Sequence, residues 1–380
     1  MPLDPNIEWI DTPDALDRAC AALAGCELLA VDTEFIRESS FHPVPALVQM
    51  TAGESVYLVD PQAVEATDAL RRLLNQGPLK LLHASSEDLE VLASWAGVLV
   101  QPLVDTQLAQ ALLAEVPSMG YQRLVEHWTG DVLPKDETRS DWLERPLSEA
   151  QCRYAALDVL YLIPIWKLQR RALDAKGRLA WLEADCAELV RQAGRDAAAD
   201  GEWYRRNRQL WRLDSRSIAA YQRLTAWREA EVRNRNLPRN WLVSDKVLFA
   251  IAEALPANRF ELAQVEGVKP TLIKREGDVL LAILREVTHL EPEDLPAALP
   301  SPMSGPFKRR LKALKSCVSE TADRLGIAPE LLAKRRDLEE LVVADLERLP
   351  PPLPEGWRGE LLATPFVQAL ETVGSETERN

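Results

Sequence analysis

The chain has 380 residues, of which 47% are hydrophobic and 27% charged, and its formal net charge is −14. This composition is typical of a soluble globular protein with room for two or three domains, and the acidic balance excludes a protein that coats nucleic acid over its whole surface. No apolar run approaches the roughly 18–20 residues that span a bilayer, and the acidic N-terminal segment MPLDPNIEWIDTPD lacks the pattern of a signal peptide.

Short β-like runs and helical patterns alternate over the first 200 residues. The β-like runs are CELLAVDTEF (26–35), PALVQMTA (45–52), SVYLVD (55–60), LKLLHA (79–84) and VQPLVDT (100–106). The helical patterns cover residues 63–76, 86–97, 106–115 and 121–130. The second and third runs are separated only by a short turn, which predicts a hairpin. Antiparallel strands first and strand–helix alternation afterwards predict an α/β domain with a mixed sheet covered by helices.

A charged loop at 131–146 leads into a long predicted helix. Ser148 and Gln151 form an S-x-x-Q capping box at its start. The helical pattern continues through RYAALDVLYL, and Pro164 predicts a kink or break.

After about residue 200 the β-like runs essentially stop. A helical region extends to about residue 288, a segment with five prolines follows at 290–306, and a second helical region begins at Phe307. A proline-rich segment of this kind is typical of an interdomain linker. We therefore divide the chain into an α/β domain (1–200), a first helical domain (201–290), a linker (291–306) and a second helical domain (307–375).

Two carboxylates end the first β-like run. Asp32 and Glu34 stand two residues apart, so their side chains point to the same face of a strand. Two negative charges a few ångströms apart raise the pKa of at least one unless a cation lies between them. Hard oxygen ligands without a nearby His or Cys cluster favour Mg²⁺ or Mn²⁺. Two such ions roughly 3.5–4 Å apart serve in-line displacement at phosphorus.

Further acidic residues occupy suggestive positions. Asp88 lies in the first turn of a predicted helix, where it serves either as a ligand or as a complement to the helix dipole. Asp105 precedes a helical pattern and is most simply its N-cap. Tyr154 and Asp158 are four residues apart and share one face of the long helix, either in a site or as packing beside a solvated acid.

In this order and at these spacings, VDTEF, HASSEDLEVL and YAALD resemble the three motifs of the DEDD exonucleases. A Tyr before the last Asp is similar to the tyrosine subgroup of that family. The resemblance extends to CRYAALDVLYLIPI, TRSDWLERPLSEAQ and GWRGELL, so that it covers nearly the whole chain, including two helical HRDC-type domains.

The resemblance implies an RNase H-like (DnaQ-like) fold and a metal-dependent 3′→5′ exoribonuclease that trims structured RNA ends, such as those of tRNA precursors, and releases nucleoside monophosphates. By motif position, Asp32, Glu34, Asp88 and Asp158 would hold two divalent cations. Tyr154 would orient the attacking water. The resemblance also suggests a monomer.

Three residues near the motifs are further candidates for RNA contact. His83 is either a phosphate ligand or a hydrogen-bonded structural histidine. Gln49 bonds either the substrate backbone or the edge of the sheet. Phe35 stacks on a terminal base or belongs to the core.

Residues 201–240 form a basic island. They contain ten arginines against four acids, with aromatic residues interleaved. Arginine among aromatics suits neutralisation of phosphates and stacking on bases, so we expect part of this face, with Arg228, Arg233 and Arg235, to contact RNA. The alternative is that the tryptophans are mostly core and some arginines pair with acids of the α/β domain. A second island, FKRRLKALK, is equally compatible with a solvated helix face.

Two rival functions remain beside the exoribonuclease. One keeps the chemistry and degrades single-stranded DNA. The other is a non-catalytic RNA-binding protein on a nuclease fold, against which the intact set of five candidate catalytic residues speaks. Five scattered cysteines, none in a CxxC pair, indicate reduced thiols and a cytoplasmic protein. Since no apolar run is long enough to span a bilayer, we expect no membrane partner.

Overall fold

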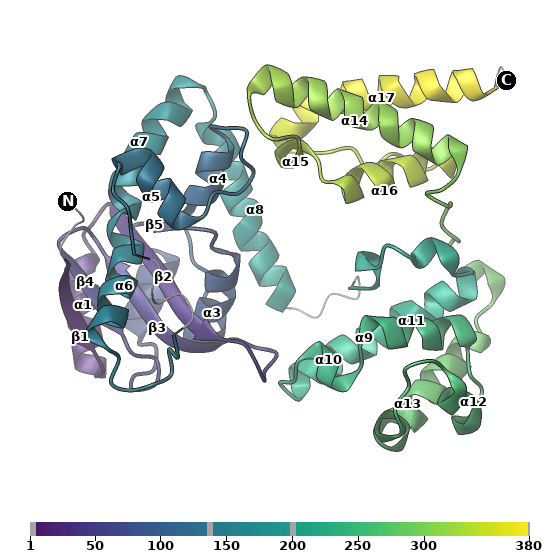
Figure 1. Cartoon of the computed structure of the whole chain (residues 1–380), viewed down its shortest axis with the longest axis horizontal. Helices are drawn as coiled ribbons and strands as arrows, with labels where there is room; N and C mark the ends of the chain where they lie inside the picture. Colours follow the sequence, from purple (N-terminus) through teal and green to yellow (C-terminus); the bar gives the residue numbers. More distant parts are fainter. Residues whose placement is uncertain (1–4, 135–139, 198–202, 379–380) are drawn as a thin grey trace.

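The computed structural model describes residues 5–134, 140–197 and 203–378 (Figure 1). Among these residues the strands form one six-stranded sheet, in which β3 pairs antiparallel with β2 and β4 while the other neighbours are parallel. In sheet order the strands are β1 (Asn6–Ile10), β4 (Ser55–Val59), β3 (Val44–Thr51), β2 (Leu28–Ile36), β5 (Leu79–Leu82) and β6 (Leu103–Asp105). The predicted hairpin is β3–β4, and the predicted mixed sheet is confirmed.

Helices cover both faces of this sheet. One face packs against α1 (Pro13–Leu23), α2 (Asp68–Asn75), α3 (Ser86–Ala96) and part of α8 (Leu179–Ala197). The other packs against α4 (Thr106–Ala111), α5 (Tyr121–Thr129), α6 (Glu149–Leu160) and α7 (Leu162–Ala175). Because side chains alternate along β2, Leu29 and Val31 enter the first core and Ala30 the second. Asp32 and Glu34 follow Ala30 on the face that α6 crosses.

The long predicted helix is interrupted before Pro164. The capping box is present, since Ser148 accepts from the backbone N–H of Gln151 and Gln151 accepts from that of Ser148. Helix α6 ends at Leu160, four residues before the proline, whose missing N–H cannot bond the Leu160 carbonyl. Helix α7 then begins at Leu162. The predicted break is confirmed, and it ends α6 within one turn of Asp158.

The first strand and helix were not predicted. Strand β1 is an edge strand in which only Ile10 is buried, so its sequence lacks the apolar alternation that identifies a strand. Helix α1 did carry a start signal, because Thr12 caps it and Pro13 occupies its first turn.

The C-terminal half is helical, as predicted. Its first group comprises the 3₁₀ turns η1 (Trp203–Arg206) and η2 (Leu210–Arg212), then α9 (Ser215–Asn234), α10 (Arg239–Leu242), α11 (Asp245–Ala254), α12 (Arg259–Gln264) and α13 (Pro270–Thr288). After the short turn η3 (Pro292–Asp294), the second comprises α14 (Gly305–Leu325), α15 (Pro329–Leu332), α16 (Arg335–Leu346) and α17 (Gly356–Glu378). None of the helices that the structure describes has the length and apolarity needed to cross a membrane.

The predicted division into domains stays an interpretation of this arrangement. The first predicted boundary, at residues 200 and 201, lies outside the described residues. The proline-rich segment between α13 and α14 contains only η3, and its role as an interdomain linker stays a prediction.

The second helical group packs against the α/β part through the GWRGELL segment. The Trp357 indole stacks on that of Trp181 with ring centroids 4.5 Å apart. Arg358 forms an ion pair with Asp185 at 2.5 Å, and the Trp357 indole N–H donates to the same carboxylate at 3.1 Å. This segment therefore has a structural role in the protein.

Candidate active site

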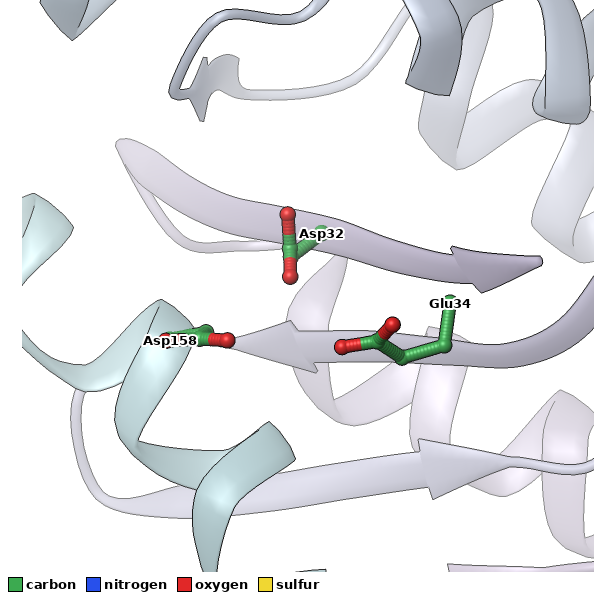
Figure 2. Close-up of side chains that lie close together, drawn as sticks. All are labelled: Asp32, Glu34 and Asp158. Atoms are coloured by element: carbon green, nitrogen blue, oxygen red, sulfur yellow. The ribbon is translucent and has the colours of Figure 1, made fainter. Parts of the chain in front are cut away.

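Three carboxylates converge where α6 crosses β2. Asp32 and Glu34 come from β2 and Asp158 from α6, and Figure 2 shows their carboxylates directed toward one shared space. One oxygen of each lies within 4.8 Å of the others, a spacing at which a single cation can be held. The strand period places Asp32 and Glu34 on one face of β2, and the packing of α6 on that face brings Asp158 to them from more than 120 positions away.

Asp88 approaches from α3 and lies outside this closest group. It is buried in the first turn of that helix, and the Thr33 hydroxyl donates a 2.5 Å hydrogen bond to it. Thr33 faces away from Asp32 and Glu34 because side chains alternate along β2. The negative charge of Asp88 nevertheless raises the pKa of both Asp32 and Glu34, which shows that it belongs to the same acidic field.

Burial is the largest cause of raised pKa values in this cluster. It raises the pKa of Glu34 to about 9, with added repulsion from Asp158 and Asp88. Burial also raises the pKa of Asp158 to about 7 and that of Asp88 to about 6. The pKa of Asp32 rises as well, first by burial and then by the charges of Asp88, Asp158 and Glu34. The four carboxyls are partly buried and offer only oxygen atoms, and their raised pKa values show that their negative charges are poorly compensated. A hard divalent cation would compensate these charges.

These shifts predict that the metal-free protein loses stability as the pH rises from 5.5 to 7.5. The carboxyls have higher pKa values in the folded protein than in the unfolded chain, so the folded state binds more protons in this range and its free energy of unfolding falls with pH. The measurement is the melting temperature in EDTA at several pH values. A flat or rising profile would contradict the prediction, and saturating Mn²⁺ should flatten the wild-type slope because the cation replaces the protons.

Tyr154 lies beside the cluster, as its position one turn before Asp158 predicts. Its hydroxyl donates a hydrogen bond to the Asp158 carboxylate, which lowers the pKa of that group against the larger effect of burial. The Trp142 ring lies 6.0 Å from the Tyr154 ring and restricts its position.

Tyr121 is a neighbour of the site that sequence reasoning missed. Its hydroxyl donates to the Leu157 carbonyl at 2.9 Å, and its pKa is raised by burial and then by the charges of Asp158 and Asp32. Nothing in the sequence around position 121 distinguishes it from an ordinary core tyrosine at a helix start. Its hydrogen bond ties α5 to the turn of α6 that carries Asp158.

Asp105 and His83 have structural partners. Asp105 caps α4 by accepting from the backbone N–H groups of Gln107 and Leu108, as predicted, and it also accepts from Ser85. The Nδ1 atom of His83 lies 2.9 Å from the Thr106 hydroxyl, and burial lowers the pKa of its imidazole. This favours the structural reading of His83; a contact with phosphate stays a prediction.

Gln49 and Phe35 differ in what they can reach. Gln49 lies opposite Asp32 in the β2–β3 pair and is fully buried, with no hydrogen-bond partner for its amide among the described residues. The amide is inaccessible to RNA in this structure, which corrects the prediction that Gln49 contacts the substrate. Its side chain lies inside the sheet, beside Asp32. Phe35 is half-buried at a register irregularity in β2, and its stacking on a base stays a prediction.

All three predicted RNA-contacting arginines are paired with acids, and these acids belong to the first helical group rather than to the α/β domain. Arg228 is fully buried and forms ion pairs with Glu229 and Asp245 at 3.1 and 2.8 Å. It is therefore a structural residue, which corrects the expectation that it contacts RNA. Arg233 also pairs with Glu229, at 3.3 Å, and Arg235 pairs with Glu231 and Glu276 at 2.6 Å each. Contacts of these two partly exposed residues with RNA stay predictions.

Replacing Glu229 with Gln should destabilise the first helical group by about 3–5 kcal/mol, the usual cost of breaking a buried ion pair. Its carboxylate is 1% exposed and also accepts from Arg239 at 2.9 Å, so the neutral amide leaves three guanidinium groups with less charge compensation. Urea unfolding followed by tryptophan fluorescence measures the loss. The matched control is Glu231→Gln, at a more exposed pair, which should cost under about 1 kcal/mol; equal losses would contradict the role of burial.

Comparison with known proteins identifies relatives along nearly the whole chain. Family models match residues 7–173 (3'-5' exonuclease), 217–284 (HRDC domain) and 306–366 (Ribonuclease D, C-terminal HRDC domain). Ribonuclease D of Pseudomonas paraeruginosa is 40% identical over 375 residues, covering 97% of this chain and 98% of the relative. Ribonuclease D of Escherichia coli is 36% identical over 374 residues, covering 96% and 99%.

Solved structures agree with these matches. The crystal structure of Escherichia coli RNase D, described as an exoribonuclease involved in structured RNA processing, superposes with a TM-score of 0.87 at 34% identity and covers 97% of this chain and 99% of that one. The catalytic core of RRP6 from Trypanosoma brucei shares the fold, with a TM-score of 0.54 at 21% identity over 75% of this chain and 81% of that one. The expected exonuclease fold followed by helical HRDC domains is confirmed.

Proposed function

This chain belongs to the ribonuclease D family and is a nuclease, and we propose that it is a two-metal 3′→5′ exoribonuclease that trims structured RNA ends, such as those of tRNA precursors. The observation that carries the proposal is the convergence of Asp32, Glu34 and Asp158 on one space, with Asp88 in the same acidic field. The proposed products are nucleoside 5′-monophosphates.

Divalent cations are expected for this fold, and Mg²⁺ or Mn²⁺ is our proposal for their identity. Asp32, Glu34 and Asp158 would hold one ion, and Asp88 would join Asp32 at the second, as the order of the motifs implies. Bound there, the cations would supply charge stabilisation for the attacking and leaving oxygens of an in-line displacement.

The remaining roles fall to the protein's own groups. We propose that Tyr154 orients the attacking water, since its hydroxyl oxygen keeps lone pairs that accept a hydrogen bond while its proton is donated to Asp158. Thr33 would fix the direction of the Asp88 carboxylate through its 2.5 Å hydrogen bond. Phe35, on the strand that carries Asp32 and Glu34, is a proposed stacking surface for the terminal base.

RNA is the substrate that family membership supports, with the HRDC domains as additional binding surface. We propose a monomer located in the cytoplasm, where the five free cysteines would remain reduced.

A labelled-oligomer assay tests the proposal. Matched 5′-labelled RNA and DNA oligomers are incubated with the full chain and Mg²⁺, Mn²⁺ or EDTA, and the products are resolved at single-nucleotide resolution. We expect an RNA ladder shortened stepwise from the 3′ end, release of nucleoside 5′-monophosphates and no reaction in EDTA. Faster degradation of DNA would favour the DNA exonuclease instead, and RNA binding without hydrolysis under any metal would favour the non-catalytic alternative.

A further inference from the structure

A cavity of about 410 Å³ opens in the first helical group, away from the carboxylates. It lies between the η1–η2 turn, α9 and the start of α11, and its lining includes Trp203, Arg206, Arg208, Tyr221, Lys246 and Phe249. The volume is within the range of cavities that take small ligands. Nothing in the proposed hydrolysis uses this cavity.

The cavity carries an excess of positive charge. Arg206, Arg208 and Lys246 are exposed at its lining, and Asp245 is the one acid there. Asp245 is half exposed and forms a 2.8 Å ion pair with the buried Arg228, so the lining keeps a net positive charge of three cations against one acid. Arg208 has no hydrogen bond or ion pair to any residue that the structure describes, and the pair of Lys246 with Glu266 is fully exposed and therefore weak. Three cations are thus available to an anionic ligand.

A stack of alternating aromatic rings and guanidinium groups connects the α/β part to this cavity. Arg239 lies over the Phe41 ring at 4.8 Å and over the Trp203 ring at 3.8 Å, and Arg206 lies over Trp203 at 3.8 Å as well. The Arg206 and Arg239 guanidinium groups are equally close to the Trp203 ring centroid and would collide on one face. They therefore lie on opposite faces of the indole. Phe41 belongs to the loop between β2 and β3, and β2 carries Asp32 and Glu34.

A hydrogen-bonded contact fixes this arrangement at the nuclease end. The Asn236 side chain accepts from the backbone N–H groups of Phe41 and His42, both at 3.0 Å. At the other end Asn207 donates to the Tyr221 hydroxyl at 3.0 Å, which holds the wall of the cavity to α9. The cavity is therefore at a defined position relative to the strand that carries the catalytic carboxylates.

We infer that this cavity binds an unpaired nucleotide of the RNA substrate, upstream of the 3′ end that occupies the active site. Arg208 and Lys246 contact its phosphate, and Arg206, supported from behind by Trp203, presents a guanidinium plane on which the base stacks. This inference rests on the proposed exoribonuclease function for the identity of the strand. A nucleotide-binding role accounts for the difference between two sets of arginines. Arg206 and Arg208 line the cavity, whereas Arg228, Arg233 and Arg235 form ion pairs with acids.

Binding of oligouridylate in EDTA tests the inference without cleavage. The double variant Arg206→Gln, Arg208→Gln should bind a 16-nucleotide strand about tenfold less tightly or worse, because it loses the charge-assisted hydrogen bond of Arg208 to phosphate and the stacking of the base on Arg206. The slope of log affinity against log salt should fall by about 0.7 for each lost phosphate contact. A four-nucleotide strand held at the active site offers at most three upstream nucleotides and should lose much less. The matched control is Arg259→Gln, an exposed arginine of the same helical group paired with Asp278, which should bind both strands as the wild type does.

A crosslinking measurement on the wild-type chain covers the case in which the double variant unfolds. With 4-thiouridine placed at successive positions of the 16-nucleotide strand, one upstream register should crosslink to residues 203–209. Crosslinks confined to the α/β part, or a double variant that binds like Arg259→Gln, would overturn the inference. Failure of the proposed function is separate, because it appears as absent cleavage by the wild type with Mg²⁺ or Mn²⁺ whatever the binding result.

Discussion

Replacing Asp32 with Asn should abolish RNA hydrolysis while raising the melting temperature of the metal-free protein. Asp32 is the carboxylate that every other member of the cluster affects, and the change removes its charge with almost no change in volume. Several kcal/mol of transition-state stabilisation depend on a bound catalytic cation, which corresponds to a loss of about 10³-fold or more in kcat. Single-turnover cleavage of a 5′-labelled RNA with Mg²⁺ measures it.

The stability change in the same variant has a distinct physical cause. Without metal, the wild type has four acidic groups held close together, and the Asn variant relieves part of their repulsion. With Mn²⁺, the wild type should gain stability by ligand binding and the variant should gain little. The matched control is Glu87→Gln, an exposed acid beside Asp88, which should behave as the wild type in both conditions. Activity of the Asp32 variant within a few-fold of wild type would remove Asp32 from the site.

The carboxylate cluster was largely predictable because it rests on local periodicity. Asp32 and Glu34 share a strand face by the period of two, and Tyr154 and Asp158 share a helix face at a separation of four. The contact between these two elements depends on tertiary packing, and the motif resemblance supplied it. The Thr33 hydroxyl that holds Asp88, and Tyr121 beside Asp158, carry no local signal, since both are ordinary residues in their own elements.

The basic island at residues 201–240 shows that a count of charges along the chain does not suffice to predict an RNA-binding surface. A local excess of arginine over acid suggested a surface for RNA, yet one buried carboxylate, Glu229, compensates Arg228, Arg233 and Arg239 together. Burial concentrates the effect of that single charge, because the effective dielectric is lower than at the surface. Only the folded structure separates these paired arginines from Arg206 and Arg208, which line the cavity.

Replacing Tyr154 with Phe should lower kcat by about 10²–10⁴-fold, the range typical of positioned catalytic groups, and leave RNA affinity nearly unchanged. The ring and its contact with Trp142 remain, so the change removes only the hydroxyl. In the wild type this hydroxyl donates to Asp158 and lowers the pKa of that group. Its loss should therefore raise the Asp158 pKa further, and a cation must then displace a more tightly held proton.

A measurable consequence is that half-maximal Mn²⁺ binding by the Phe variant moves to higher pH, a shift that lost packing would not produce. Titration of Mn²⁺ between pH 5.5 and 8 reads this shift, and RNA binding in EDTA reads substrate affinity. The matched control is Tyr57→Phe, which removes a hydroxyl from β4, a strand without any of the carboxylate ligands, and should leave both readouts at wild-type values. A loss confined to KM, with kcat and the metal titration unchanged, would assign Tyr154 to substrate binding, because a group that orients the attacking water contributes in the transition state rather than in the bound ground state.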